Sequence, residues 1–248
     1  MLTSANEPSV GPWAQRRRGR RRAARDPGAF PDRRARVSRR WFCFDVGETL
    51  INETRLWGLW ADACGVSPLT MAAATGATIA LERSHQDAFA LVGVPDWRER
   101  EPQVQAAYGG FAARDLYPDA LPTLATLAAA GYRIAVMGNQ PAHRHGELAA
   151  IGVTPDVMAM SQAMGPEKPD PAFFTVALRL MGDPDPHDVA YVGDRVDNDV
   201  GPSAAAGMRP VWVRRGPWGV LHEDCHGHAR LVVRSLRELV DRVDEVWA

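Results

Sequence analysis

Short apolar runs alternate with longer stretches of helical periodicity along the chain from Arg40 onward. Each run holds three to five residues and is flanked by turn-forming or polar residues. This pattern is typical of strands that are buried on both faces of a parallel sheet. The strands predicted in this way are 41–44, 133–137, 156–160, 189–192, 210–213 and 231–233.

Helical stretches follow most of these strands, as they must if parallel strands are joined by crossover connections. Gly131, Gly152 and Gly182 come directly after three of the stretches, which is the position that a C-terminal capping glycine prefers. The alternation predicts an α/β fold, a doubly wound parallel sheet that binds ligands at the carboxyl ends of its strands. The helices expected in this part of the chain are 121–130, 143–151, 171–181, 202–206 and 236–246.

Residues 53–113 contain no convincing strand. We expect a small helical insertion there, which divides the α/β domain into residues 41–52 and 114–248. Three stretches of this insertion have helical periodicity, namely 56–64, 70–83 and 104–114.

The first forty residues differ from the rest in charge. Residues 1–40 contain 12 arginines, no lysine and three acidic residues, so their net charge is +9 and that of residues 41–248 is −10. They lack helical and strand periodicity, which favours a disordered arm or a reading frame that begins upstream of a true start near Val37. An arm that binds nucleic acid or a membrane is the alternative. No apolar segment follows the arginines, so a secretory signal is not expected.

Composition argues against several classes of protein. The acidic body disfavours nucleic acid as a partner of the α/β domain, because phosphate backbones are bound by clustered lysine and arginine. No apolar run reaches the roughly 18 residues that a membrane-spanning helix needs. Cys43, Cys64 and Cys225 follow no disulfide or metal-ligand spacing, which favours the reducing cytoplasm.

Four polar clusters come directly after the ends of predicted strands, at 44–50, 136–139, 167–171 and 192–199. Each one alone is weak, because Asp after a strand is common as a helix cap and Asn after Gly is common in a turn. The last is the most specific: Asp194 and Asp199 lie five residues apart around a turn, a spacing that can place two carboxylates near one hard cation. Lys168 is the one lysine among 29 basic residues, so it is a candidate for a position where arginine cannot serve.

In this order, the four clusters resemble the motifs of the haloacid-dehalogenase-like (HAD) hydrolase superfamily, and the resemblance covers residues 41 to about 235. It implies a Rossmann-like parallel sheet in which Asp45 is the nucleophile. It also implies that Lys168 is the motif lysine, and that Asp194 and Asp199 are the acidic pair of the last motif.

The resemblance further implies a Mg²⁺-dependent phosphatase that acts on a small phosphorylated metabolite through an aspartyl-phosphate intermediate. A carboxylate cannot approach an anionic phosphate ester unless the repulsion is cancelled, and Mg²⁺ with Lys168 would cancel it. The implied metal ligands are Asp45, the carbonyl of Gly47, Asp194 and Asp199. The phosphate would be held by Gly138, Asn139, Lys168 and the backbone near Val46.

The helical stretch 53–113 resembles the small helical cap of one subclass of this superfamily. Only 28 residues separate Asn139 from Lys168, which leaves no room for the large cap that other subclasses insert there. In the family the cap covers the site and chooses the substrate. The candidate selectors are therefore Arg55, Trp57, Trp60 and His85, although ordinary packing or surface exposure is the alternative for each.

Two positions depart from the family pattern. Family phosphatases usually carry a second Asp, a general acid and base, two residues after the nucleophile, and this chain has Gly47; they usually carry Ser or Thr before the motif Asn, and this chain has Gly138. General acid–base help is worth about 10²–10⁴-fold in rate. Three explanations are open: a good leaving group needs no acid, Glu48 or a cap residue supplies it, or the protein binds a phosphorylated ligand or a partner without turnover.

Two further alternatives concern metals. A metal-independent 2-haloacid dehalogenase also lacks the second Asp, but the paired carboxylates of the last motif favour phosphate and Mg²⁺. A second cluster could hold Zn²⁺ by its spacing: His222, Cys225, His226 and His228. A polar loop is the favoured interpretation of this cluster, because no second group of ligands stands elsewhere in the chain. The oligomeric state stays open.

Overall fold

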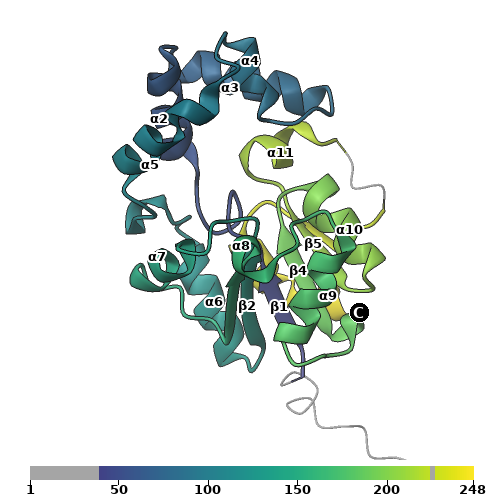
Figure 1. The fold of residues 1–248 in the computed structure, drawn as a ribbon. Helices are drawn as coiled ribbons and strands as arrows, with labels where there is room; N and C mark the ends of the chain where they lie inside the picture. The colour runs from purple at the N-terminus through teal and green to yellow at the C-terminus, as the bar shows by residue number, and fades with distance from the viewer. Residues whose placement is uncertain (1–38, 224–226) are drawn as a thin grey trace, which may run out of the picture. The chain divides into compact units, whose positions relative to one another are not determined.

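A computed structural model describes residues 39–223 and 227–248. Its centre is a six-stranded sheet in which all strands run parallel, in the order β3-β2-β1-β4-β5-β6 (Figure 1). The strands are β1 Trp41–Phe44, β2 Arg133–Gly138, β3 Val157–Met160, β4 Val189–Gly193, β5 Arg209–Val213 and β6 Leu231–Val233. The predicted doubly wound α/β fold is confirmed, and each strand matches its predicted range to within one residue. The predictions for residues 1–38 lie outside the described residues.

The central strands are buried on both faces because their large apolar side chains alternate between two cores. Phe42 and Phe44 of β1 pack on one face beneath α6, α7, α12 and α13. Trp41 and Cys43 point to the other face, where α9 packs. This two-sided burial explains why the strands appear as continuous apolar runs in the sequence. The helices on these faces are α6 Ala120–Ala129, α7 Arg144–Ala150, α9 Pro171–Leu180, α10 Gly201–Ala205, α12 Leu236–Asp241 and α13 Val243–Trp247.

Local chemistry sets where these helices begin and end. Asp170 caps α9 by accepting a hydrogen bond from the backbone N–H of Ala172, and Pro171 occupies the first turn. The predicted single helix 236–246 is wrong: the chain leaves helical geometry at Arg242, whose φ is −119°, and α13 starts afterwards. The short helix α8 Ser161–Met164 was not predicted.

A helical segment follows β1, and the described chain has no named strand between β1 and α6. Its core is formed by Trp60, Met71, Phe89 and Val104, each from a different helix. Its elements are α2 Thr54–Cys64, α3 Pro68–Ala80, α4 Asp87–Leu91, the 3₁₀ turn Trp97–Arg100 and α5 Glu101–Tyr108. The predicted helix 104–114 ends early, because Gly109 and Gly110 take positive φ.

Another short helix, α11 Gly216–Leu221, lies after β5 and contacts α3 of the helical segment (Figure 1). The sequence did not predict α11 or α4. No single helix among the described residues has the length and apolar character needed to cross a membrane. The consecutive helices α2 and α3 meet those criteria only when taken together, and they are bent by 106° at the break between them.

Candidate functional site

The carboxyl ends of the central strands bring the four polar clusters to one place. Phe44 of β1 lies in register with Val136 of β2 and Val192 of β4, so the residues after these strands leave the sheet at the same level. The backbone N–H of Asp45 donates to the carbonyl of Val192 over 2.9 Å, which fixes the first turn after β1 to β4. Asp45, Asp194 and Asp199 are buried, and one carboxylate oxygen of each lies within 4.8 Å of the others.

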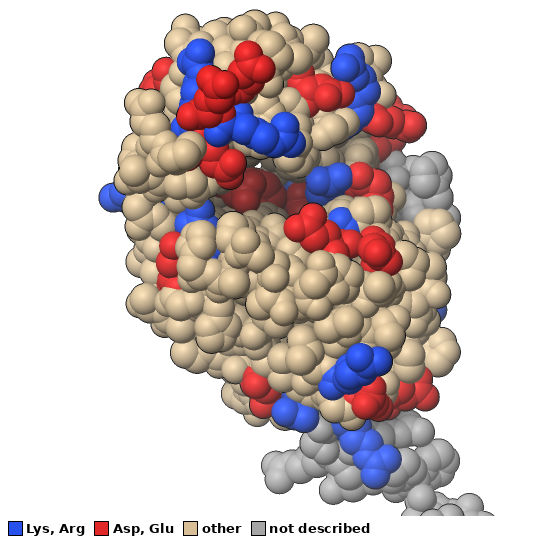
Figure 2. All heavy atoms as spheres, viewed as in Figure 1, with Lys and Arg blue, Asp and Glu red and all other residues tan. Residues whose placement is uncertain are grey.

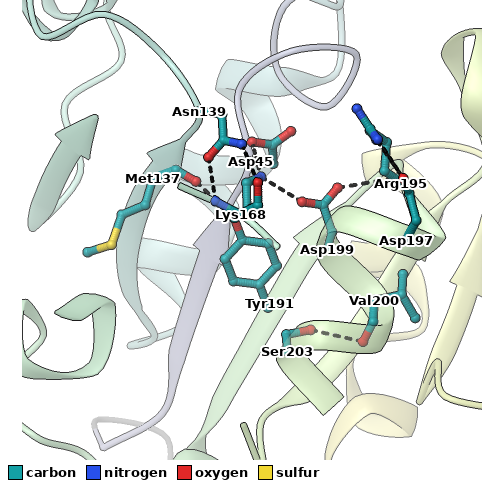
Figure 3. A network of polar contacts seen from close by, with 10 residues as sticks. All are labelled: Asp45, Met137, Asn139, Lys168, Tyr191, Arg195, Asp197, Asp199, Val200 and Ser203. Atoms are coloured by element: carbon teal, nitrogen blue, oxygen red, sulfur yellow. Dashed lines mark hydrogen bonds and ion pairs between the residues drawn. The ribbon is translucent and has the colours of Figure 1, made fainter. Parts of the chain in front are cut away.

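Lys168 joins two of these carboxylates. Its ammonium donates to Oδ1 of Asp45 and to Oδ1 of Asp199, both over 2.6 Å (Figure 3). The side chain is 1% exposed. Burial lowers the pKa of Lys168, but the charges of Asp199 and Asp45 outweigh it and hold the pKa above its usual value. Lys168 is therefore a fixed positive charge beside Asp45 at neutral pH.

The backbone of Lys168 is held by Asn139. The Asn139 amide donates to the carbonyl of Lys168, and its Oδ1 accepts from the N–H of Lys168, each over 2.8 Å (Figure 3). This pair of bonds joins the end of β2 to the loop before α9. Asn139 thus positions the lysine, and its predicted contact with phosphate stays a prediction.

Asp199 lies behind the lysine and is fully buried. Its Oδ1 accepts from Lys168 and its Oδ2 accepts from the backbone N–H of Arg195 over 3.0 Å. Gly193 permits this packing, because a Cβ at that position would lie 2.4 Å from Cγ of Asp199. Both oxygens of Asp199 therefore have partners within the protein.

Asp194 has the opposite environment. Its side chain is buried, and its Oδ2 has no hydrogen-bond partner among the described residues. Burial raises the pKa of Asp194 well above its ordinary value, and the negative charges of Asp199 and Asp45 raise it further. The one ammonium of this group pairs with Asp45 and Asp199 and not with Asp194. A divalent cation with oxygen ligands fits this donor set and the open oxygen of Asp194.

Gly138 lies directly against Asp45. A Cβ on Gly138 would lie 2.6 Å from Oδ1 of Asp45 and 3.1 Å from Cγ2 of Val46. The absence of a side chain at this position therefore lets the carboxylate reach Lys168. Burial raises the pKa of Asp45 to about 6. The positive charge of Lys168 opposes this rise, and the negative charge of Asp199 adds to it.

Glu48 was one candidate for the missing acid, and both of its oxygens are engaged. Its Oε1 accepts from the backbone N–H of Glu53 over 2.9 Å and its Oε2 accepts from the hydroxyl of Tyr117 over 2.5 Å. The residue takes φ of +49° in the turn after β1. Its carboxylate thereby fastens this turn to the start of α2.

Glu53 is a site residue that the sequence did not reveal. It stands immediately before α2 and lines the same cavity as Asp45 and Gly47. A Cβ on Gly47 would lie 2.7 Å from its Oε1, so the carboxyl group fills the space beside the glycine. Burial raises the pKa of Glu53 to about 8, and repulsion from Glu48 and Asp45 adds to this. No sequence motif marks Glu53, because its position follows from the turn between β1 and α2.

The cavity over these residues has a volume of about 350 Å³. Figure 2 shows the hollow on this face, with acidic side chains in its depth. Asp45, Gly47, Lys168 and Asp194 line its floor, and Asn198, which the sequence did not single out, lines it too. Aromatic side chains form much of its wall: Trp57, Trp60, His85, Phe89, Trp97 and Trp218.

Three of the four predicted selectors line this cavity, namely Trp57, Trp60 and His85. Arg55 does not, because its guanidinium is engaged elsewhere. It pairs with Asp115 at 2.5 Å and donates to the carbonyls of Tyr108 and Gly110. Arg55 therefore fastens α2 to the end of α5.

The predicted zinc cluster is described in part, since Cys225 and His226 lie outside the described residues. Nδ1 of His222 accepts from the backbone N–H of Val196 over 3.4 Å, and His228 is exposed. Within residues 39–223 and 227–248, metal-ligating side chains converge at the three aspartates described above.

Comparison with known proteins places this site in a family context. Residues 40–207 match the family model for haloacid dehalogenase-like hydrolases. A glyceraldehyde 3-phosphate phosphatase of Methanopyrus kandleri is 35% identical over 111 residues, 44% of this chain and 47% of the relative, so the match spans about half of that protein. A phosphoserine phosphatase of Thermus thermophilus is 31% identical over 194 residues, 73% of this chain and 76% of the relative. The crystal structure of a predicted phosphoglycolate phosphatase from Haemophilus somnus superposes with a TM-score of 0.62 at 22% identity, covering 82% of this chain and 97% of the other.

Proposed function

Since the chain belongs to the haloacid dehalogenase-like hydrolases, we propose that it is a Mg²⁺-dependent phosphatase of a small phosphorylated metabolite, with Asp45 as nucleophile. The observation that carries this proposal is the buried group of Asp45, Lys168 and Asp194 at the floor of one cavity. The Lys168 ammonium lies 2.6 Å from Oδ1 of Asp45 and favours the ionised, nucleophilic form of that carboxyl group. The Oδ2 of Asp194, which has no hydrogen-bond partner among the described residues, is available to a cation.

The proposed reaction follows from these positions. The Asp45 carboxylate attacks phosphorus, the bond to the ester oxygen breaks, and the aspartyl-phosphate is then hydrolysed by water. Lys168 cancels part of the negative charge that would keep nucleophile and phosphate apart. Mg²⁺ held by Asp45, Asp194 and the carbonyl of Gly47 would supply the remaining positive charge. Asp199 contributes by holding Lys168, and its role as a direct metal ligand stays a prediction.

The cavity supports a substrate of modest size. Its volume of about 350 Å³ suits a small metabolite, and the relatives are named for glyceraldehyde 3-phosphate and phosphoserine. We infer that residues 53–113 act as a cap, since α2, α4 and α5 contribute Trp57, Phe89 and Gln105 to its wall. The buried Arg144 of α7 also lines this wall, where its guanidinium pairs with Glu147 over 2.6 Å and donates to Gln105 over 2.8 Å.

A panel of small phosphate esters, assayed for release of inorganic phosphate with MgCl₂ and with EDTA, tests this function. We expect turnover with Mg²⁺, loss of turnover with EDTA, and no turnover by Asp45→Asn. Asp62→Asn is the matched control, because Asp62 is an exposed aspartate of α2. Halide release from a 2-haloacid that persists in EDTA would establish the dehalogenase instead, and tight binding of esters without turnover would establish a binding protein.

A further inference from the structure

A phosphatase of this kind needs a proton at the ester oxygen. An alkyl phosphate leaves as a strongly basic alkoxide unless an acid protonates it during bond cleavage. Among the carboxyl groups that line the cavity, Asp45 is the proposed nucleophile and Asp194 faces the proposed cation. Both oxygens of Glu48 are already engaged, as described above. Glu101 is exposed on α5. The carboxyl group that remains beside Asp45 and Gly47 is that of Glu53.

We propose that Glu53 is the general acid and base of this chain, a role that rests on the proposed phosphatase function. Gly47 stands two residues after Asp45, and a Cβ on this glycine would lie 2.7 Å from Oε1 of Glu53. The carboxyl group of Glu53, the residue before α2, therefore fills the space that the missing side chain leaves. Glycine at 47 is what makes this approach possible.

Two contacts hold Glu53 in this position. Its backbone N–H donates to Oε1 of Glu48 over 2.9 Å, and the side chain of Trp57, one turn along α2, lies next to its carboxyl group. Trp57 itself stacks on Phe89 with ring centroids 6.1 Å apart. The carboxyl group is therefore oriented by packed neighbours, as proton transfer to a bound substrate requires.

The proposed steps balance as follows. As an Asp45 oxygen bonds to phosphorus, the electron pair of the breaking P–O bond passes to the ester oxygen, which takes the proton of Glu53. The products are an alcohol, the aspartyl-phosphate and the Glu53 carboxylate. Glu53 then accepts a proton from the attacking water, the P–O bond to Asp45 breaks, and inorganic phosphate and the Asp45 carboxylate are released.

Glu53→Gln tests this role, because glutamine keeps the size of the side chain but carries no acidic proton. The probes are glycerol 3-phosphate, with a basic alkoxide leaving group, and p-nitrophenyl phosphate, with a weakly basic one. In single-turnover assays with MgCl₂ we expect ester cleavage of glycerol 3-phosphate to fall by about 10²–10⁴-fold. Release of p-nitrophenolate in the first turnover should change far less and should be followed by slow steady turnover, because the second step has lost its base. Glu99→Gln, an exposed glutamate, is the matched control.

A rescue variant separates a catalytic role from a structural one. Glu53→Ala should lose cleavage of the alkyl ester, and Gly47→Asp in the same chain should restore part of it, because the new carboxyl group then has room. Gly47→Asp alone should not help, since its side chain meets Glu53 at 2.7 Å. Equal losses for both esters in Glu53→Gln, or no loss, would overturn the assignment. A wild-type chain that cleaves neither ester would overturn the proposed function instead.

Discussion

Substituting Gly138 by alanine tests whether activity depends on the position of the Asp45 carboxylate. The added methyl group would lie 2.6 Å from Oδ1 of Asp45 and 3.1 Å from Val46. Ordinary contact begins at 3.4 Å, so the carboxylate would have to withdraw by about 0.8 Å. Lys168 holds the same oxygen at 2.6 Å, and the withdrawal therefore stretches or breaks that bond.

The size of the effect follows from this displacement. A misplacement of about 1 Å at a reacting group can cost about 10²-fold in rate. Overpacking of a close-packed site typically destabilises a protein by about 1–3 kcal/mol. For a chain of this length each kcal/mol lowers the melting temperature by about 2–4 °C. We therefore expect Gly138→Ala to lose about 10²-fold in rate and to melt about 2–12 °C below the wild type.

The assay is the rate of p-nitrophenolate release with MgCl₂, beside the melting temperature of each variant. Gly146→Ala in α7 is the matched control, because no heavy atom lies within 4 Å of its added Cβ. Removing a glycine from a helix should stabilise that control by up to about 1 kcal/mol. Wild-type rates in Gly138→Ala would refute the argument that this glycine positions the nucleophile.

Three further predictions concern charge. Lys168→Met leaves Asp45 and Asp199 without their shared cation, which should lower the free energy of unfolding by about 3–5 kcal/mol in EDTA; an unchanged urea midpoint would contradict the ion pairs. MgCl₂ should raise the melting temperature of the wild type by mass action and should do so much less in Asp194→Asn; equal shifts would remove Asp194 from the metal site. Burial lowers the pKa of His85 from 6.5 to about 4, so its contribution to stability is present above pH 6.5 and is lost as pH falls towards 4. His85→Gln should therefore lose less melting temperature over this range than the wild type, and an equal or larger loss would contradict the assignment.

The strands of the sheet could be predicted closely because strands that are buried on both faces are apolar at every position. Phe42 and Phe44 pack beneath one layer of helices while Trp41 and Cys43 pack beneath the other, so the whole run is apolar. Helices α4 and α11 span only five and six residues, so their sequences carry little helical repeat. Helix α5 ends early because Gly109 and Gly110 take positive φ, and the spacing of apolar residues does not predict backbone dihedral angles.

The site could be predicted where residues follow strands directly. Asp45 and Asp194 come within one residue of β1 and β4, and the order of parallel strands then brings them together. Glu53 could not be found in this way. Its place beside Gly47 depends on the turn that Glu48 fastens through its side chain, a tertiary contact with no sequence spacing of its own. The partners of Asn139 were likewise set by tertiary contact with Lys168.

The most direct test of the central proposal is chemical trapping of Asp45 during turnover. The wild-type chain is mixed with MgCl₂ and p-nitrophenyl phosphate, quenched in acid and reduced with borohydride, which converts an aspartyl-phosphate into homoserine. Mass spectrometry of the peptide that contains Asp45 should then show homoserine at this position, and a sample prepared with EDTA should show unchanged aspartate. Release of phosphate with Asp45 unchanged, or homoserine at another position, would contradict the proposed mechanism.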